Sequence, residues 1–141
     1  MPKGKRQALG PKGAATPVGP YSPAVRYGDL LFVSGQGPRH PATGQVAQGI
    51  EAEAEQVLEN VKTIVVGAGF RMEDALHARV YLTHIEDFEA LNRVYRRYFP
   101  KEHPARTTVA VSALPLVGTC VEIDLLVGKS ASPARPARRK R

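Results

Sequence analysis

Residues 76–99 read LHARVYLTHIEDFEALNRVYRRYF, and the spacing of apolar residues changes within this stretch. From Leu76 to Leu82 every second residue is aliphatic or alanine, and the residues between are His, Arg and Tyr. A period of two predicts a β-strand with one buried face. From about Glu86 to Phe99 the apolar residues recur at helical spacing, and Pro100 ends the pattern. The stretch therefore predicts a strand followed by a helix.

The two spacings of apolar residues, every second residue and helical, also occur elsewhere in the chain. A longer helix is predicted over Gly49–Val66, and short strands over Leu30–Val33, Arg106–Ala113 and Cys120–Val127. Strands and helices therefore alternate along the middle of the chain. This order predicts an α+β single domain, with one mixed β-sheet and two helices on one face. Residues Leu114–Gly118 predict a hairpin between the last two strands.

The second face of such a sheet has no helix to cover it. Val121, Ile123 and Leu125 share one face of the last strand, because side chains two apart point the same way. We assign these apolar residues to the uncovered face, where water would meet them. An exposed apolar face of this kind favours burial against another subunit.

Basic residues gather at the two ends of the chain, which has 141 residues and a net charge of +7. Residues 1–15 hold four Lys or Arg and residues 129–141 hold six, with no acidic residue in either segment. Their composition predicts disordered basic tails. Residues 16–128 form the predicted folded domain, where thirteen acidic residues against ten Lys or Arg give a net charge of −3.

The charge distribution and the composition limit the classes of partner that we expect. A nucleic-acid-binding face on the domain would need clustered cations, which a net charge of −3 disfavours, although the tails predict weak binding to anionic polymers. No apolar run is long enough to span a bilayer, and no apolar signal region opens the chain. One cysteine allows no internal disulfide. We expect a cytoplasmic protein that does not contact membranes.

Three residues near the C-terminal strands are candidates for chemistry. Arg106 opens a strand, where a guanidinium can hold a carboxylate in a two-pronged fork. Glu122 and Asp124 share a face of the last strand, and a carboxylate there can orient a water. Together they suggest hydrolysis of a small organic acid. From the residues alone, a structural ion pair between an arginine and one of these carboxylates is the favoured reading.

Other polar residues carry weaker signals. Tyr21 is held between Pro20 and Pro23, and Asn92 lies on the apolar face of the second predicted helix. Both types of placement are more often structural than functional. The four histidines lack metal-ligand spacing, so no metal site is assigned. Cys120 reads as a small buried residue rather than a nucleophile, and no glycine pattern makes a phosphate loop.

Several motifs then occur in a recognisable order between Thr16 and Gly128. They are Gly19-Pro20-Tyr21-Ser22-Pro23-Ala24, Val33-Ser34-Gly35-Gln36, Asn60-Val61-Lys62, Asp87-Phe88 with Leu91-Asn92, Pro104-Ala105-Arg106-Thr107-Thr108, and Val121-Glu122-Ile123-Asp124. With these motifs the chain resembles the reactive-intermediate deaminase family, also called Rid, YjgF or L-PSP endoribonuclease.

The resemblance implies a chorismate-mutase-like fold assembled as a homotrimer, with the sheets forming an inner barrel and the active sites in clefts between subunits. It implies hydrolysis of enamine and imine acids, such as 2-iminopropanoate and 2-iminobutanoate, to 2-keto acids and ammonia, without a cofactor. By motif, the catalytic residues are Arg106, which binds the carboxylate, Glu122, which positions water, and Tyr21. Ser34, Gly35 and Asn92 are the further substrate-binding residues.

The chain departs from the family pattern at two places. Thr108 stands where many relatives carry a cysteine, so thiol chemistry is lost there. The loop Leu114–Thr119 is one residue longer, so the assignment of Glu122 depends on the register of the last strand, and Asp124 is the alternative. Two other functions stay open: a ligand-binding or regulatory protein of the same fold, and, less favoured, an RNA-directed endoribonuclease.

Overall fold

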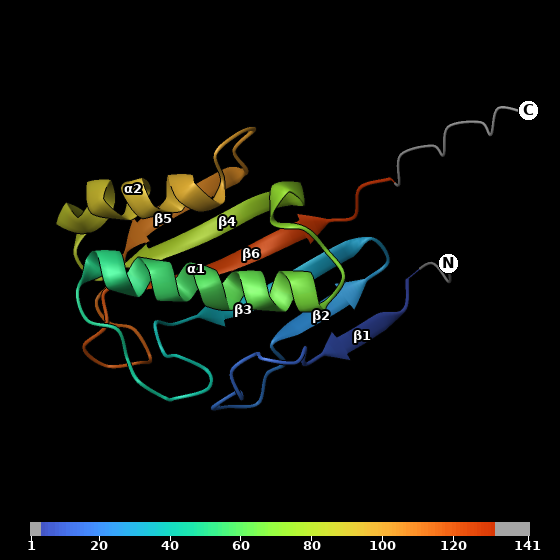
Figure 1. Ribbon diagram of the computed structural model, residues 1–141, viewed down its shortest axis with the longest axis horizontal. Coiled ribbons are helices and arrows are strands. Elements are labelled where there is room, and N and C mark those ends of the chain that lie inside the picture. The colour runs from blue at the N-terminus through green and yellow to red at the C-terminus, as the bar shows by residue number, and fades with distance from the viewer. Residues whose placement is uncertain (1–3, 132–141) are drawn as a thin grey trace, which may run out of the picture.

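The structure, a computed structural model, describes residues 4–131 and is an α+β fold with a single mixed sheet (Figure 1). Its strands are β1 (Arg6–Leu9), β2 (Ala24–Tyr27), β3 (Leu30–Gln36), β4 (Ala75–Leu82), β5 (Ala105–Ala110) and β6 (Val121–Gly128). Its helices are α1 (Ile50–Gly67) and α2 (Phe88–Tyr98), with short 3-10 turns η1 (Met72–Asp74) and η2 (Ile85–Asp87). Both helices lie on one face of the sheet, as the sequence predicted.

The strand order is β1-β2-β3-β6-β4-β5, and this order corrects the predicted hairpin. β5 pairs in parallel with β4, and β6 pairs antiparallel with both β3 and β4. β4, α2 and β5 form a crossover unit, which places β5 beyond β4 at the edge of the sheet. The segment from 111 to 120 therefore crosses from one side of β4 to the other instead of making a tight turn.

The core lies between the sheet and the two helices. Val121, Ile123 and Leu125 are buried there, at 0%, 0% and 2% exposure, in the same cluster as Leu58 and Leu91. The prediction that they lie on the uncovered face was wrong. Alternation along β6 was read correctly, but alternation alone does not say which of its two faces the helices cover.

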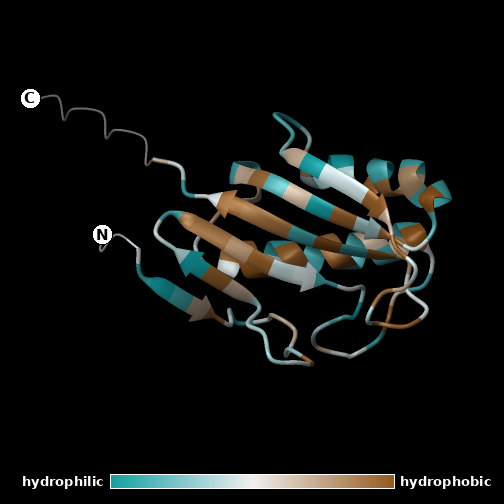
Figure 2. Cartoon of the chain, turned by 180° about the vertical axis from the view of Figure 1, so that it is seen from behind, coloured by the Kyte–Doolittle hydropathy of each residue, from teal (hydrophilic) through white to brown (hydrophobic). Residues whose placement is uncertain are grey.

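Figure 2 views the sheet from the face that the helices do not cover. The side chains that alternate with the buried ones along each strand lie on this face. Phe32 lies opposite Leu126 between β3 and β6, and Arg79 lies opposite Asp124 between β4 and β6. Phe32 is 47% exposed and Val109, on β5, is 40% exposed. This face is thus apolar at β3 and charged at its centre.

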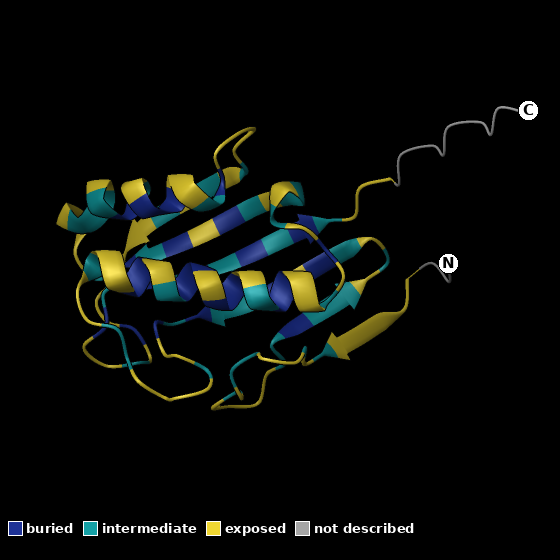
Figure 3. Ribbon diagram, viewed as in Figure 1, coloured by how far each residue is buried: buried dark blue, intermediate teal, exposed yellow. Residues whose placement is uncertain are grey.

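The N-terminal segment also differs from its prediction. Instead of a disordered tail over 1–15, Arg6–Leu9 form β1, which pairs antiparallel with β2 and is exposed along most of its length (Figure 3). Backbone pairing needs little apolar content, so hydropathy gave no signal for this strand. Pro11 then packs on α1, where a Cβ at Gly67 would come within 2.7 Å of it.

At the other end, part of the predicted tail contacts the domain. The Lys129 amide donates to the Asp29 carbonyl at 2.8 Å, and Lys129 Nζ donates to the Gly69 carbonyl at 2.9 Å. The rest of that predicted tail, from residue 132, lies outside the described residues, as do residues 1–3. Within residues 4–131, neither helix is long and apolar enough to cross a bilayer.

Candidate functional site

A cavity of about 330 Å³ opens between the N-terminal loop, the end of β3 and β6, and we call it the Glu122 cavity. It contains three of the predicted site residues, Tyr21, Gly35 and Glu122. Its other lining residues are Ala15, Thr16, Val18, Pro23, Gln36, Gly37, Arg39, Asn60, Pro115 and Leu116. On β6, the Glu122 side chain therefore faces a cavity.

Gly35 allows the Glu122 carboxylate to occupy this position. A Cβ atom built on Gly35 would lie 2.8 Å from Glu122 Oε2 and 3.0 Å from its carboxyl carbon. Such a contact is shorter than van der Waals separation, so any side chain here would displace the carboxylate. A bulge in the pairing of β3 with β6 between Val33 and Gln36 brings the two groups together.

Glu122 and Asp124 have different environments although they share a face. Asp124 accepts from Arg79 Nε at 2.9 Å and from the Tyr81 hydroxyl at 3.1 Å. Glu122 has no hydrogen-bond or ion-pair partner within residues 4–131. Burial, and secondarily the negative charge of Asp124, raise the pKa of Glu122 above its usual value. The ion-pair interpretation therefore holds for Asp124, whereas Glu122 is free to interact with a ligand.

Tyr21 and Ser34 have distinct positions. The Tyr21 ring is 48% exposed at the cavity, and its hydroxyl accepts from the Val18 amide at 3.3 Å. The Ser34 hydroxyl donates to the Ser22 carbonyl at 2.6 Å. Ser34 is not among the residues that line the cavity, and its contact fastens the Tyr21 loop to β3.

Asn60 is a cavity residue to which the sequence analysis gave no role. It is buried on α1, and its Nδ2 donates to the carbonyls of Gly37 at 3.1 Å and Arg39 at 2.8 Å. These bonds hold the segment that follows β3 against the helix. An amide inside the apolar stripe of α1 was the available signal, because buried amides require partners.

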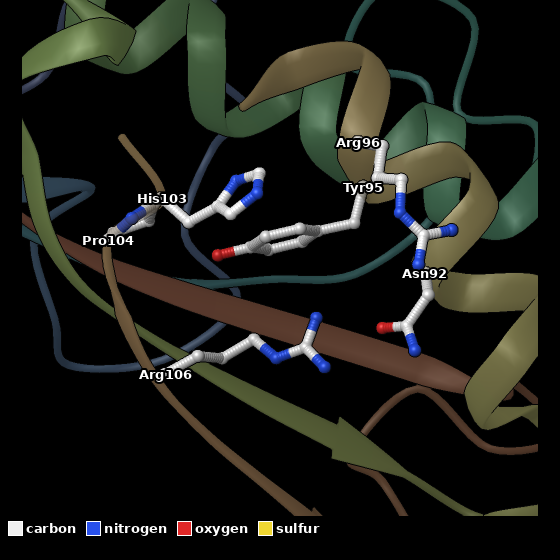
Figure 4. Close-up of a pocket in the computed structure, with 6 residues that line it drawn as sticks. All are labelled: Asn92, Tyr95, Arg96, His103, Pro104 and Arg106. Atoms are coloured by element: carbon white, nitrogen blue, oxygen red, sulfur yellow. The ribbon is translucent and has the colours of Figure 1, made fainter. Parts of the chain in front are cut away.

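A second cavity, of about 250 Å³, lies between α2 and the start of β5, and we call it the Arg106 cavity (Figure 4). It is lined by Asn92, Tyr95, Arg96, His103, Pro104 and Arg106. The Arg106 guanidinium carbon lies 4.8 Å from the Tyr95 ring centre and 5.5 Å from that of Phe88. Within the described chain this guanidinium has no ion pair or hydrogen bond, and the two rings fix its position by cation–π contact.

Tyr95 was predicted only as part of an apolar helix face. Its ring is buried, and its hydroxyl has no hydrogen-bond partner in the described part of the chain. Burial raises the pKa of Tyr95 to about 12, so the phenol stays neutral at physiological pH. His103, at the far side of the ring, contacts the Phe99 carbonyl through Nδ1 at 2.8 Å.

Arg106 and Glu122 do not meet within one chain. Arg106 is paired with Ala78, which is buried under the helices, whereas Glu122 is paired with Tyr81 on the uncovered face. The two groups therefore point to opposite faces of the sheet, with β4 between their strands. Within one chain, therefore, Arg106 and the β6 carboxylates do not converge on one site. Thr108 shares the Arg106 face of β5.

The remaining candidates have structural roles. The Cys120 amide donates to Glu53 Oε1 at 2.7 Å, which joins the start of β6 to α1. Burial, followed by the contact with Glu53, raises the pKa of Cys120 to about 11, so the thiol is protonated and weakly nucleophilic. Across residues 4–131, no three His, Cys, Asp or Glu side chains are grouped as metal ligands would be.

The sequence of residues 12–128 matches the family model described as Endoribonuclease L-PSP. The chain belongs to this family. A RutC family protein from Saccharolobus solfataricus is 43% identical over 118 residues, which cover 83% of this chain and 93% of the relative. The endoribonuclease L-PSP family thus accounts for the order of motifs in the sequence.

Two solved structures agree with the fold. Escherichia coli TdcF with bound serine has a TM-score of 0.84 at 34% identity, covering 88% of this chain and 99% of TdcF. RidA from an Antarctic Psychrobacter bacterium has a TM-score of 0.83 at 38% identity, covering 86% of this chain and 98% of RidA. Each of these two structures is matched over almost its whole length.

Proposed function

We propose that the protein hydrolyses reactive enamine and imine acids, of the 2-iminopropanoate and 2-iminobutanoate type, to 2-keto acids and ammonia. The observation that carries this proposal is that two side chains of opposite charge, one in each cavity, lack an ionic partner. Arg106 offers a fixed guanidinium, and Glu122 offers a half-buried carboxylate, neither with an ionic partner in residues 4–131. The first suits a substrate carboxylate and the second suits a water.

The two groups can act on one molecule only if they come from different copies of the chain. We place the active site where the Arg106 cavity of one subunit faces the Glu122 cavity of the next, in a homotrimer. The uncovered sheet face supports such an assembly, because Phe32 and Val109 leave large apolar surfaces in water in a lone subunit. In the trimer these faces would form the inner barrel.

The reaction follows from these positions. Arg106 holds the carboxylate, and Glu122 orients a water toward the C=N carbon and takes one of its protons. The C–O bond forms while the nitrogen is protonated, which gives a carbinolamine. Transfer of the hydroxyl proton to the amino nitrogen, relayed by Glu122, then breaks the C–N bond, releases ammonia and leaves the keto acid, so one water is consumed per imine. These steps require no cofactor.

Three further residues complete the proposed site. The Tyr21 ring and the backbone at Gly35 would border the substrate on the Glu122 side, and Asn92 would border it on the Arg106 side. Serine bound to TdcF supports a site for a small amino-acid-like molecule. A protein that only binds such a ligand would use the same residues, so turnover must be measured.

Mixed assemblies test this proposal most directly. Arg106→Ala and Glu122→Gln should each abolish release of keto acid from freshly generated 2-iminobutanoate. When the two variants are co-expressed and purified together through different tags, some sites combine an intact Arg106 with an intact Glu122. We expect measurable recovery of activity in these mixed assemblies. The two variants purified separately and then mixed, under conditions in which subunits do not exchange, should show no recovery.

The control is a co-expressed pair that carries the same substitution under both tags, which can form no intact site. Equal inactivity of the mixed and control assemblies would contradict a shared site. Binding of 2-oxobutanoate by wild-type protein without any imine hydrolysis would instead favour the ligand-binding alternative. RNA cleavage that survives both substitutions would favour the endoribonuclease alternative.

A further inference from the structure

Helix α2 carries three arginines, and only one of them lacks an ionic partner in the described chain. Arg93 contacts Glu51 at 3.0 Å and Arg97 contacts Glu55 at 3.7 Å, so both reach across the outer surface to α1. Arg96 forms no ion pair within residues 4–131 and lines the Arg106 cavity instead. Of the adjacent residues Arg96 and Arg97, the first therefore lines the cavity and the second connects α2 to α1.

The Arg106 cavity is strongly biased toward positive charge. Two guanidiniums, Arg96 and Arg106, line it, and none of its six lining residues is acidic. Figure 4 shows Arg96 and Asn92 extending from α2 on the side toward which the Arg106 guanidinium points. Like charges that share one cavity repel each other, and an anion between them removes that repulsion.

A substrate with a single carboxylate needs only one of these two arginines to bind it. Arg106 is held against the Tyr95 ring, which fixes its fork for the carboxylate adjacent to the imine carbon. Arg96 extends from a different element, and its guanidinium is not restrained by an aromatic ring within residues 4–131. The cavity volume of about 250 Å³ also exceeds what a three-carbon acid fills.

We infer that the favoured substrates carry a second carboxylate: they are imines of dicarboxylic amino acids, such as 2-iminoglutarate, with Arg96 binding the side-chain carboxylate. The inference rests on the proposed function, because it assigns the first carboxylate to Arg106. Arg96 then determines specificity and takes no part in the bond-breaking steps. Charge recognition of this kind discriminates more strongly than added apolar surface does.

The test compares 2-iminoglutarate with 2-iminopentanoate, which has the same carbon chain without the second carboxylate. Both are generated freshly by oxidation of glutamate and norvaline. We expect wild-type kcat/KM to favour the dicarboxylic imine by about tenfold, the scale of one charge-assisted hydrogen-bonded contact. Arg96→Gln should remove most of this preference by raising KM for 2-iminoglutarate more than KM for 2-iminopentanoate. Arg97→Gln, one position along and ion-paired outside the cavity, is the matched control.

Calorimetric binding of 2-oxoglutarate and 2-oxopentanoate separates this inference from the proposed function. If no imine is hydrolysed but 2-oxoglutarate binds more tightly in an Arg96-dependent way, the deaminase proposal fails and the ligand class stands. If Arg96→Gln weakens both acids equally, the two arginines share one carboxylate and the inference is overturned. It is overturned as well if Arg97→Gln has the same effect as Arg96→Gln.

Discussion

Glu122 is a half-buried carboxylate, and the negative charge of Asp124 on the same face of β6 repels its ionised form. Asp124 itself is neutralised in part by Arg79 and hydrogen-bonded by Tyr81, so its own position is stable. The two carboxylates therefore differ in role although they lie on one face of the same strand. One carboxylate is fixed by partners, and the other stays available with a raised pKa, as a general base requires.

This arrangement predicts the pH dependence of activity. Glu122 acts in its ionised form, so activity rises as it loses its proton, and its raised pKa moves that rise above the usual carboxylate range. Asp124→Asn removes one cause of the raised pKa. We expect the acid limb of the kcat/KM profile to shift to lower pH in this variant, with activity retained at neutral pH. A profile of kcat/KM between pH 4 and 9 measures the shift.

Glu122→Gln is the companion measurement. A raised pKa in the folded state means that the ionised group reduces stability once the pH exceeds its unfolded pKa. The inactive Glu122→Gln variant should therefore melt at a higher temperature than wild type at pH 8, and the difference should shrink at low pH. If Asp124→Asn were inactive at every pH while Glu122→Gln stayed active, the roles of the two carboxylates would be exchanged.

The sequence singled out the arginine Arg106 and the carboxylates Glu122 and Asp124, because charged groups in apolar strands need partners, and only the family resemblance preferred Glu122. It did not show that they point to opposite faces of the sheet. That relation depends on which strand lies between theirs, and residue spacing carries no information on strand order. Tyr95 was missed as a site residue because its ring fits the apolar pattern of α2.

Individual elements were predictable where their periodicity is strong. The first helix was predicted over Gly49–Val66 and is found over Ile50–Gly67. β5 and β6 were predicted within a few residues, but their pairing was wrong. Local turn signals favoured a hairpin, and the parallel pairing of β5 with β4 through α2 overrides them. β1 had no signal, since its side chains are mostly exposed.

β1 offers a prediction at the scale of one element. Deleting residues 1–9 removes its ladder with β2 and the packing of Leu9 against the core. We expect a loss of about 1–2 kcal/mol in the free energy of unfolding. Activity should persist, because the cavity wall begins at Ala15. Urea denaturation measures the loss.

Deletion of residues 1–5 is the control, because it leaves β1 complete. Its free energy of unfolding should match that of the full chain. Unchanged stability after deletion of residues 1–9 would show that β1 contributes nothing and that the segment behaves as the tail predicted from composition. Loss of activity in that deletion would show that β1 also supports the Glu122 cavity.

At the scale of the whole molecule, charge is divided between the domain and the chain ends. Residues 16–128 carry a net charge of −3, although the full chain carries +7. Within the domain, Arg79 is paired with Asp124, and Arg93 and Arg97 are paired with glutamates of α1. Sequence counting alone located this division, because charge depends on composition and not on folding.

The chain ends therefore give the last prediction, which separates RNA binding from the proposed chemistry. Ending the chain at Ala131 removes Arg135, Arg138, Arg139, Lys140 and Arg141, which lowers the net charge from +7 to +2. Affinity carried by these cations is electrostatic, falls steeply with salt, and does not depend on RNA sequence. In a gel shift at low salt, the full chain should bind RNA weakly and the shortened chain should not, while both hydrolyse imines equally. Tight, salt-resistant RNA binding by the shortened chain would locate a nucleic-acid site on the folded domain and favour the endoribonuclease alternative.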